Sequence, residues 1–108
     1  MLSYSHSFVL SPFIHIHNCI ITFTVVIYSK SYCPFCTKTK DLFKGMGVEA
    51  KVYELDNMPD GADIQSALGE LTGQRTVPNV FVAGKHIGGN SEAQTAASAG
   101  TLKELLGM

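Results

Sequence analysis

The stretch that decides the fold is residues 25–36, Val25-Val26-Ile27-Tyr28-Ser29-Lys30-Ser31-Tyr32-Cys33-Pro34-Phe35-Cys36. Its apolar, largely β-branched beginning is typical of a buried strand. A short polar turn follows. Pro34 then suits the first position of a helix, where its missing N–H costs no hydrogen bond. The stretch therefore predicts a strand, a turn and a helix.

Cys33 falls at the predicted start of this helix, next to unpaired backbone N–H groups and the positive end of the helix dipole. Lys30 adds positive charge shortly before it. These features favour the thiolate over the thiol, and the thiolate is the nucleophile. Cys36 lies one helical turn later, within reach of a disulfide with Cys33. The pattern indicates a redox site.

Zinc sites and structural disulfides use the same cysteine spacing. A structural zinc site needs four ligands, and the chain has 3 cysteines with no second pair. A site made by Cys33, Cys36, His86 and one more ligand stays conceivable. The strand–turn–helix context favours redox chemistry over both alternatives.

The 108 residues suffice for one compact domain. A formal net charge of −1 gives no basic surface typical of nucleic-acid binding. Few, unevenly placed cysteines argue against a secreted disulfide framework. We expect a cytoplasmic monomer that binds neither nucleic acid nor a membrane.

Residues 1–24 are expected to be an atypical N-terminal extension, ahead of a domain spanning residues 25–108. No Lys, Arg, Asp or Glu precedes Lys30. The extension lacks the features of a secretory signal or an arginine-rich transit peptide, although organellar targeting stays open. Pro12 and several polar residues interrupt its apolar positions, so we predict a tail or a weak strand and no membrane span.

In an extended chain, His15, His17 and Cys19 would project to the same side. Three such ligands could hold zinc or copper. No fourth ligand is evident, so the favoured interpretation is a tail whose polar side meets solvent, and no metal is expected.

The rest of the chain alternates between helical and extended patterns. We expect a helix over 34–46, a strand over 51–55 and a helix from about 61 to 72, whose buried residues would be Ile64, Ala67, Leu68 and Leu71. A hairpin of 80–82 and 86–88 should follow. The last helix should span 91–106, with a cap formed by Ser91 and Gln94 and an interruption at Gly100. Strands joined through helices should be parallel, and the hairpin antiparallel. This predicts an α/β fold, a four-stranded mixed sheet flanked by helices on both faces.

The block Tyr-Ser-Lys-Ser-Tyr-Cys-Pro-Phe-Cys at residues 28–36 resembles the active site of the glutaredoxins, the glutathione-dependent branch of the thioredoxin superfamily. The resemblance covers about residues 25–107. It implies a thioredoxin-like fold with the strands in the spatial order second, first, third, fourth. A thioredoxin is disfavoured because the chain has no tryptophan.

Two later segments resemble the same family. Gly73-Gln74-Arg75-Thr76-Val77-Pro78-Asn79-Val80-Phe81 resembles the segment with a cis proline, which would bring Val77 beside Cys33. Gly88-Gly89-Asn90-Ser91-Glu92 resembles a carboxylate-binding helix start, although the family commonly has aspartate where this chain has Glu92. Taken alone, these segments would be an ordinary proline before a strand and an ordinary turn with a cap.

The resemblance implies that glutathione binds beside Cys33. Lys30, which taken alone is a surface charge, would meet the glycine-end carboxylate together with Arg75 and Gln74. The helix start at residues 89–92 would meet the other carboxylate. The residues expected to bind glutathione are Lys30, Phe35, Gln74, Arg75, Thr76, Val77, Pro78, Gly89, Asn90, Ser91 and Glu92.

The implied reaction is reduction of protein–glutathione mixed disulfides by Cys33, and of protein disulfides by Cys33 and Cys36 together. Its partners would be glutathione, the oxidised proteins and, indirectly, glutathione reductase and NADPH. The alternative is a glutaredoxin that holds a two-iron cluster through its first cysteine and glutathione. Pro34 and Cys36 argue against it, because such members usually show Cys-Gly-Phe-Ser or a small residue in place of the proline.

Overall fold

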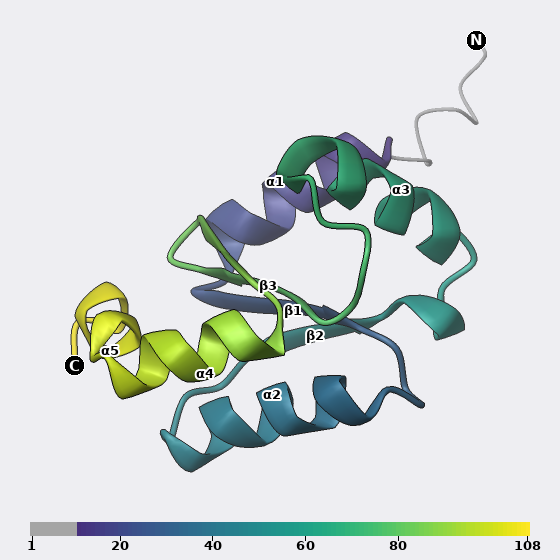
Figure 1. Cartoon of the computed structure of the whole chain (residues 1–108). Helices are drawn as coiled ribbons and strands as arrows, with labels where there is room; N and C mark the ends of the chain where they lie inside the picture. The colour runs from purple at the N-terminus through teal and green to yellow at the C-terminus, as the bar shows by residue number, and fades with distance from the viewer. Residues whose placement is uncertain (1–10) are drawn as a thin grey trace, which may run out of the picture.

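A four-stranded sheet lies between two layers of helices (Figure 1). The computed structural model describes residues 11–108. In chain order its elements are α1 (Pro12–Thr22), β1 (Val25–Ser29), α2 (Pro34–Gly45), β2 (Lys51–Glu54), the short 3₁₀ helix η2 (Leu55–Asn57), α3 (Gly61–Thr72), β3 (Asn79–Val82), β4 (Lys85–Gly88), α4 (Asn90–Ser98) and α5 (Thr101–Leu106). Helices α1 and α3 cover one face of the sheet, and α2, α4 and α5 cover the other.

The strand order is β2-β1-β3-β4, so β1 and β3 are central. Strand β1 is parallel to β2, with Ile27 opposite Val52, and antiparallel to β3, with Ile27 opposite Val80. Strands β3 and β4 form the antiparallel hairpin. The predicted α/β class and strand order are confirmed.

All five residues of β1 are buried, because helices cover both faces of this central strand. Val26 and Tyr28 pack toward α1 and α3 in one core cluster. Val25 and Ile27 pack in the opposite cluster, toward α2 and α5. The strand ends at Ser29, from which the chain turns directly into the start of α2.

The expectation of a tail or weak strand before residue 25 is wrong for the described residues, because Pro12–Thr22 form a helix. Ser11 caps it by accepting a hydrogen bond from the Ile14 N–H at 3.2 Å, and Pro12 occupies its first turn. Ile16 and Cys19 are its buried residues, and they pack against the sheet. Residues 1–10 lie outside the described part of the chain.

Two further expectations need correction. Leu71, placed on the buried side of α3, is 55% exposed. The last helical region begins at Asn90, with Gly89 as its N-cap residue, and the Glu92 carboxylate accepts the Gly89 N–H at 2.8 Å. Ser91 and Gln94 therefore do not form the cap. The expected interruption at Gly100 is confirmed, since this glycine separates α4 from α5 with a left-handed φ of 82°.

Among residues 11–108, no helix is long and apolar enough to cross a membrane.

Candidate active site

Cys33 is the N-cap residue of α2. The Cys36 N–H, one of the N–H groups that a helix start leaves without a backbone partner, points at the Cys33 sulfur with an N···S distance of 3.2 Å. The loop before Cys33 is closed by a hydrogen bond from the Cys33 N–H to the Lys30 carbonyl at 3.1 Å. The strand, the turn and the helix thus place the Cys33 sulfur against a backbone donor at the start of α2.

Cys36 lies beneath Cys33 and is fully buried. Burial raises the pKa of the Cys36 thiol, and its interaction with Cys33 raises that pKa further. Cys33 is partly exposed, so an incoming disulfide reaches it first. Of the two sulfurs, that of Cys33 is therefore the accessible one and that of Cys36 the buried one.

The segment before β3 crosses next to Cys33. The Val77–Pro78 peptide bond is cis, and the Val77 carbonyl oxygen lies 3.9 Å from the Cys33 sulfur. The Gln74 side chain braces this turn by donating hydrogen bonds to the Thr76 carbonyl at 3.0 Å and the Pro78 carbonyl at 2.9 Å. The expected position of Val77 beside Cys33 is confirmed.

A groove of about 390 Å³ runs from the start of α2 to the start of α4. One wall is the cis-proline segment, and Phe35, 57% exposed, lies at its α2 side. The groove brings together eight residues that the sequence singled out: Phe35, Thr76, Val77, Pro78, Gly89, Asn90, Ser91 and Glu92.

A buried hydrogen bond ties the two helices at this groove together. The Thr39 hydroxyl lies on the buried side of α2, 2.9 Å from the Asn90 side-chain oxygen and 3.0 Å from the Phe35 carbonyl oxygen, so its one proton is shared between these two acceptors. This contact fixes the orientation of Asn90 relative to α2. Thr39 was not among the predicted site residues, because nothing in the local sequence shows that its hydroxyl reaches α4.

A family model described as Glutaredoxin matches residues 25–87, more than half of the chain. The chain belongs to the glutaredoxin family. Glutaredoxin-C6 of Oryza sativa subsp. japonica is 56% identical over 82 residues, which is 76% of this chain and 73% of that protein. A glutaredoxin of Ricinus communis is 55% identical over 82 residues, 76% of this chain and 80% of the relative.

Solved glutaredoxin structures share the fold. A wheat glutaredoxin has a TM-score of 0.85 and 48% identity, covering 88% of this chain and 90% of that one. A buckwheat glutaredoxin–glutathione complex has a TM-score of 0.86 and 40% identity, covering 88% and 86%. The α/β sandwich of this glutaredoxin is therefore the thioredoxin-like fold, and its cysteine pair belongs to a family of thiol redox proteins.

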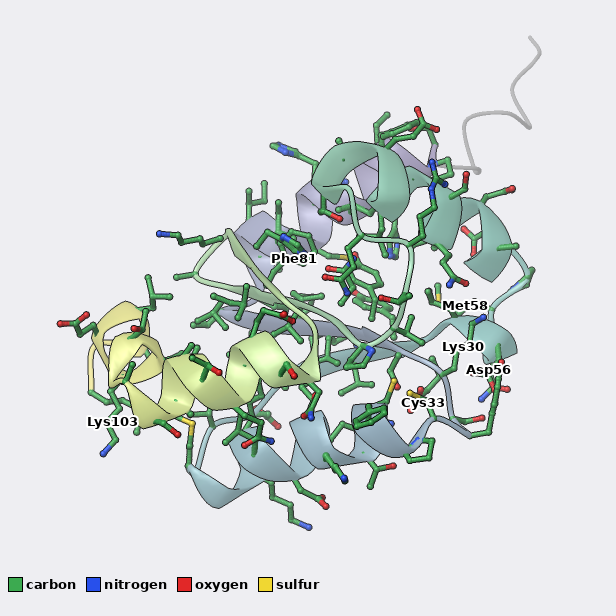
Figure 2. The ribbon with its side chains drawn as sticks, viewed as in Figure 1. Lys30, Cys33, Asp56, Met58, Phe81 and Lys103 are labelled. Atoms are coloured by element: carbon green, nitrogen blue, oxygen red, sulfur yellow. The ribbon has the colours of Figure 1, made fainter. Side chains whose placement is uncertain are left out.

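Three residues expected to bind glutathione do not line the groove of this glutaredoxin: Lys30, Gln74 and Arg75. The Gln74 amide is committed to the carbonyls of its own loop. The Arg75 side chain lies over α3, where a Cβ on Gly69 would come within 2.6 Å of the Arg75 Cγ. Lys30 lies near Asp56, at the loop that leads to Cys33 (Figure 2).

His15, His17 and Cys19, which an extended chain would place on one side, do not share one face. In α1, His15 and Cys19 are neighbours one turn apart, with a ring nitrogen 3.6 Å from the sulfur, whereas His17 is exposed. The Cys19 thiol instead contacts the Tyr53 hydroxyl at 3.0 Å. Among residues 11–108 no group of three or more His, Cys, Asp and Glu side chains is arranged to hold a metal ion.

Proposed function

We propose that this glutaredoxin uses glutathione to reduce protein–glutathione mixed disulfides, with Cys33 as the nucleophile. The observation that carries the proposal is the position of Val77, which lines the groove and lies 3.9 Å from the Cys33 sulfur. An extended tripeptide in the groove would thus have its central thiol at the sulfur. The similarity to a buckwheat glutaredoxin–glutathione complex supports this ligand.

The groove offers polar groups suited to a tripeptide. Backbone groups of Thr76 and Val77 border it and can pair with a peptide main chain. The N-terminus of α4, at Asn90 and Ser91, offers N–H groups to a carboxylate. The Glu92 carboxylate faces Gly89, so it supplies the negative charge for an amino group.

In the first step, the Cys33 thiolate attacks the glutathione sulfur of the mixed disulfide. The old S–S bond breaks, the protein leaves as a thiolate, and glutathione remains on Cys33. A second glutathione thiolate attacks that new disulfide, releases oxidised glutathione and restores the Cys33 thiolate. The two electrons come from glutathione, which glutathione reductase regenerates with NADPH.

Protein disulfides follow a related route. Cys33 attacks one sulfur of the substrate, and Cys36 then attacks the mixed disulfide at Cys33. This second step releases the reduced substrate and leaves a Cys33–Cys36 disulfide. The higher pKa of the buried Cys36 thiol suits a group that acts second.

Turnover of a glutathionylated peptide in the presence of glutathione, glutathione reductase and NADPH tests this assignment. We expect activity in the wild type and in Cys36→Ser, and none in Cys33→Ser. Cys19→Ser is the matched control, because this thiol is on the buried side of α1 and does not line the groove. A folded wild type without turnover, or loss of turnover in Cys36→Ser, would contradict the proposal.

A further inference from the structure

The loop that delivers Cys33 is tied to a distant part of the chain by one carboxylate. The Ser31 N–H donates to Asp56 Oδ1 at 2.9 Å, and the Ser31 hydroxyl donates to Asp56 Oδ2. Asp56 belongs to η2, which follows β2. The two carboxylate oxygens of Asp56 thus accept hydrogen bonds from the backbone N–H and the hydroxyl of Ser31, and the two residues are 25 positions apart in the sequence.

Two hydrogen bonds to one residue define its orientation as well as its position. Ser31 follows Lys30 directly and comes two residues before Cys33, in the turn closed by the bond from the Cys33 N–H to the Lys30 carbonyl. The position of Ser31 therefore determines where Cys33 enters α2, and so whether its sulfur meets the Cys36 N–H.

The charges at this point reinforce the contact. The two hydrogen bonds from Ser31 hold the pKa of the Asp56 carboxyl below its usual value, and attraction to Lys30 lowers that pKa further. Asp56 is therefore ionised at neutral pH. Lys30 and Asp56 lie together beside the loop in Figure 2, and Lys30 forms no ion pair within 4.0 Å among residues 11–108.

We propose that Asp56 is a positioning residue of this glutaredoxin, which holds the Lys30–Cys33 loop through Ser31 so that Cys33 caps α2. The inference deepens the function proposed above. A carboxylate repels a nearby thiolate, so the negative charge of Asp56 alone would disfavour the thiolate form of Cys33. If Asp56 supports the thiolate, it does so through the geometry it imposes.

The test separates geometry from charge. Asp56→Ala removes both acceptors and the charge, whereas Asp56→Asn removes the charge and keeps one acceptor oxygen for Ser31. Asp63→Asn is the control for losing an exposed acidic side chain, since Asp63 lies in the first turn of α3 and forms no ion pair among residues 11–108. The rate of Cys33 alkylation at neutral pH is measured by peptide mass spectrometry without glutathione, so a failed glutathione assay would not affect it.

We expect Asp56→Ala to slow Cys33 alkylation at neutral pH about fivefold, because the loop loses charge-assisted hydrogen bonds at a solvent-exposed site. Asp56→Asn should recover much of the rate, and thermal unfolding should stay cooperative. An unchanged rate in Asp56→Ala would overturn the proposal. So would a faster rate, since it would show that the charge of Asp56 outweighs its hydrogen bonds.

Discussion

The Cys33 sulfur accepts a hydrogen bond from the Cys36 N–H at 3.2 Å, while the Cys36 thiol itself is buried beneath it. Cys36 thus contributes in two ways: its backbone N–H donates to the Cys33 sulfur, and its side chain provides a second, buried thiol. The two roles follow from the two residues that separate Cys33 from Cys36, because the N–H of the third helical residue points back at the N-cap side chain.

Brief alkylation of the reduced protein should modify Cys33 first. Burial raises the pKa of Cys36, so its thiolate becomes abundant only at higher pH. Peptide mass spectrometry after short exposure to iodoacetamide at neutral and alkaline pH measures both sites. Faster labelling of Cys36 than of Cys33 at neutral pH would contradict the assigned order.

Thr39→Val should weaken glutathione binding by several-fold through KM, with a smaller effect on kcat. The substitution preserves shape but removes the hydroxyl that holds the Asn90 side chain at 2.9 Å. The cost in folding free energy should be about 1–2 kcal/mol, because a buried hydrogen bond is lost and Asn90 keeps access to solvent. Steady-state kinetics and urea denaturation measure these effects.

Thr95→Val on the exposed side of α4 is the matched control, and it should change neither quantity. An unchanged KM in Thr39→Val would show that Asn90 keeps its orientation without Thr39.

Gln74→Met should reduce kcat/KM for the glutathionylated peptide about tenfold, by releasing two carbonyls of the cis-proline loop that Gln74 braces. Gln65→Met is the control. Gln65 donates to the neighbouring Arg75 carbonyl at 2.8 Å, outside the groove, so its loss should affect stability more than turnover. Equal kinetic effects in both variants would indicate a general loosening of the segment.

The strand–turn–helix unit that carries the cysteine pair was predictable from sequence because it is local. Residues 25–36 alone specify the buried strand, the turn and the capped helix, and the resemblance supplied the strand order and the cis proline. The eight residues that line the groove had been singled out as well, because seven of them fall in two continuous segments, 76–78 and 89–92, and Phe35 belongs to the cysteine motif itself.

Side-chain directions and long-range contacts were harder to predict from the sequence. Gln74 and Arg75 directly precede the groove residues 76–78 in the sequence. In the fold, however, the Gln74 side chain bonds to its own loop and the Arg75 side chain lies over Gly69 of α3. Helix α1 was missed because its sequence alternates apolar and polar residues as a strand would. Its helical state is favoured by burial of Ile16 and Cys19 against the sheet, a contact that no local pattern shows.

The final prediction concerns stability at alkaline pH. The Tyr28 hydroxyl is buried with no hydrogen-bond partner among residues 11–108, and it lies near Cys19. Burial raises the pKa of Tyr28 above its ordinary value of 10.0, and burial likewise raises the pKa of Tyr53. The folded chain therefore keeps these protons at a pH where the unfolded chain releases them, so stability should fall as pH rises above the ordinary phenol pKa.

Tyr28→Phe removes the hydroxyl without changing the ring. At neutral pH we expect it to be neutral or stabilising by about 1 kcal/mol, because an unpaired buried hydroxyl is replaced by hydrogen. The decline in stability above about pH 10 should also become shallower, since one phenol no longer ionises on unfolding. Urea denaturation of wild type and variant at neutral and alkaline pH measures both effects. A variant that is clearly less stable at neutral pH would mean that the hydroxyl has a partner after all, and the nearby Cys19 sulfur would be the first candidate.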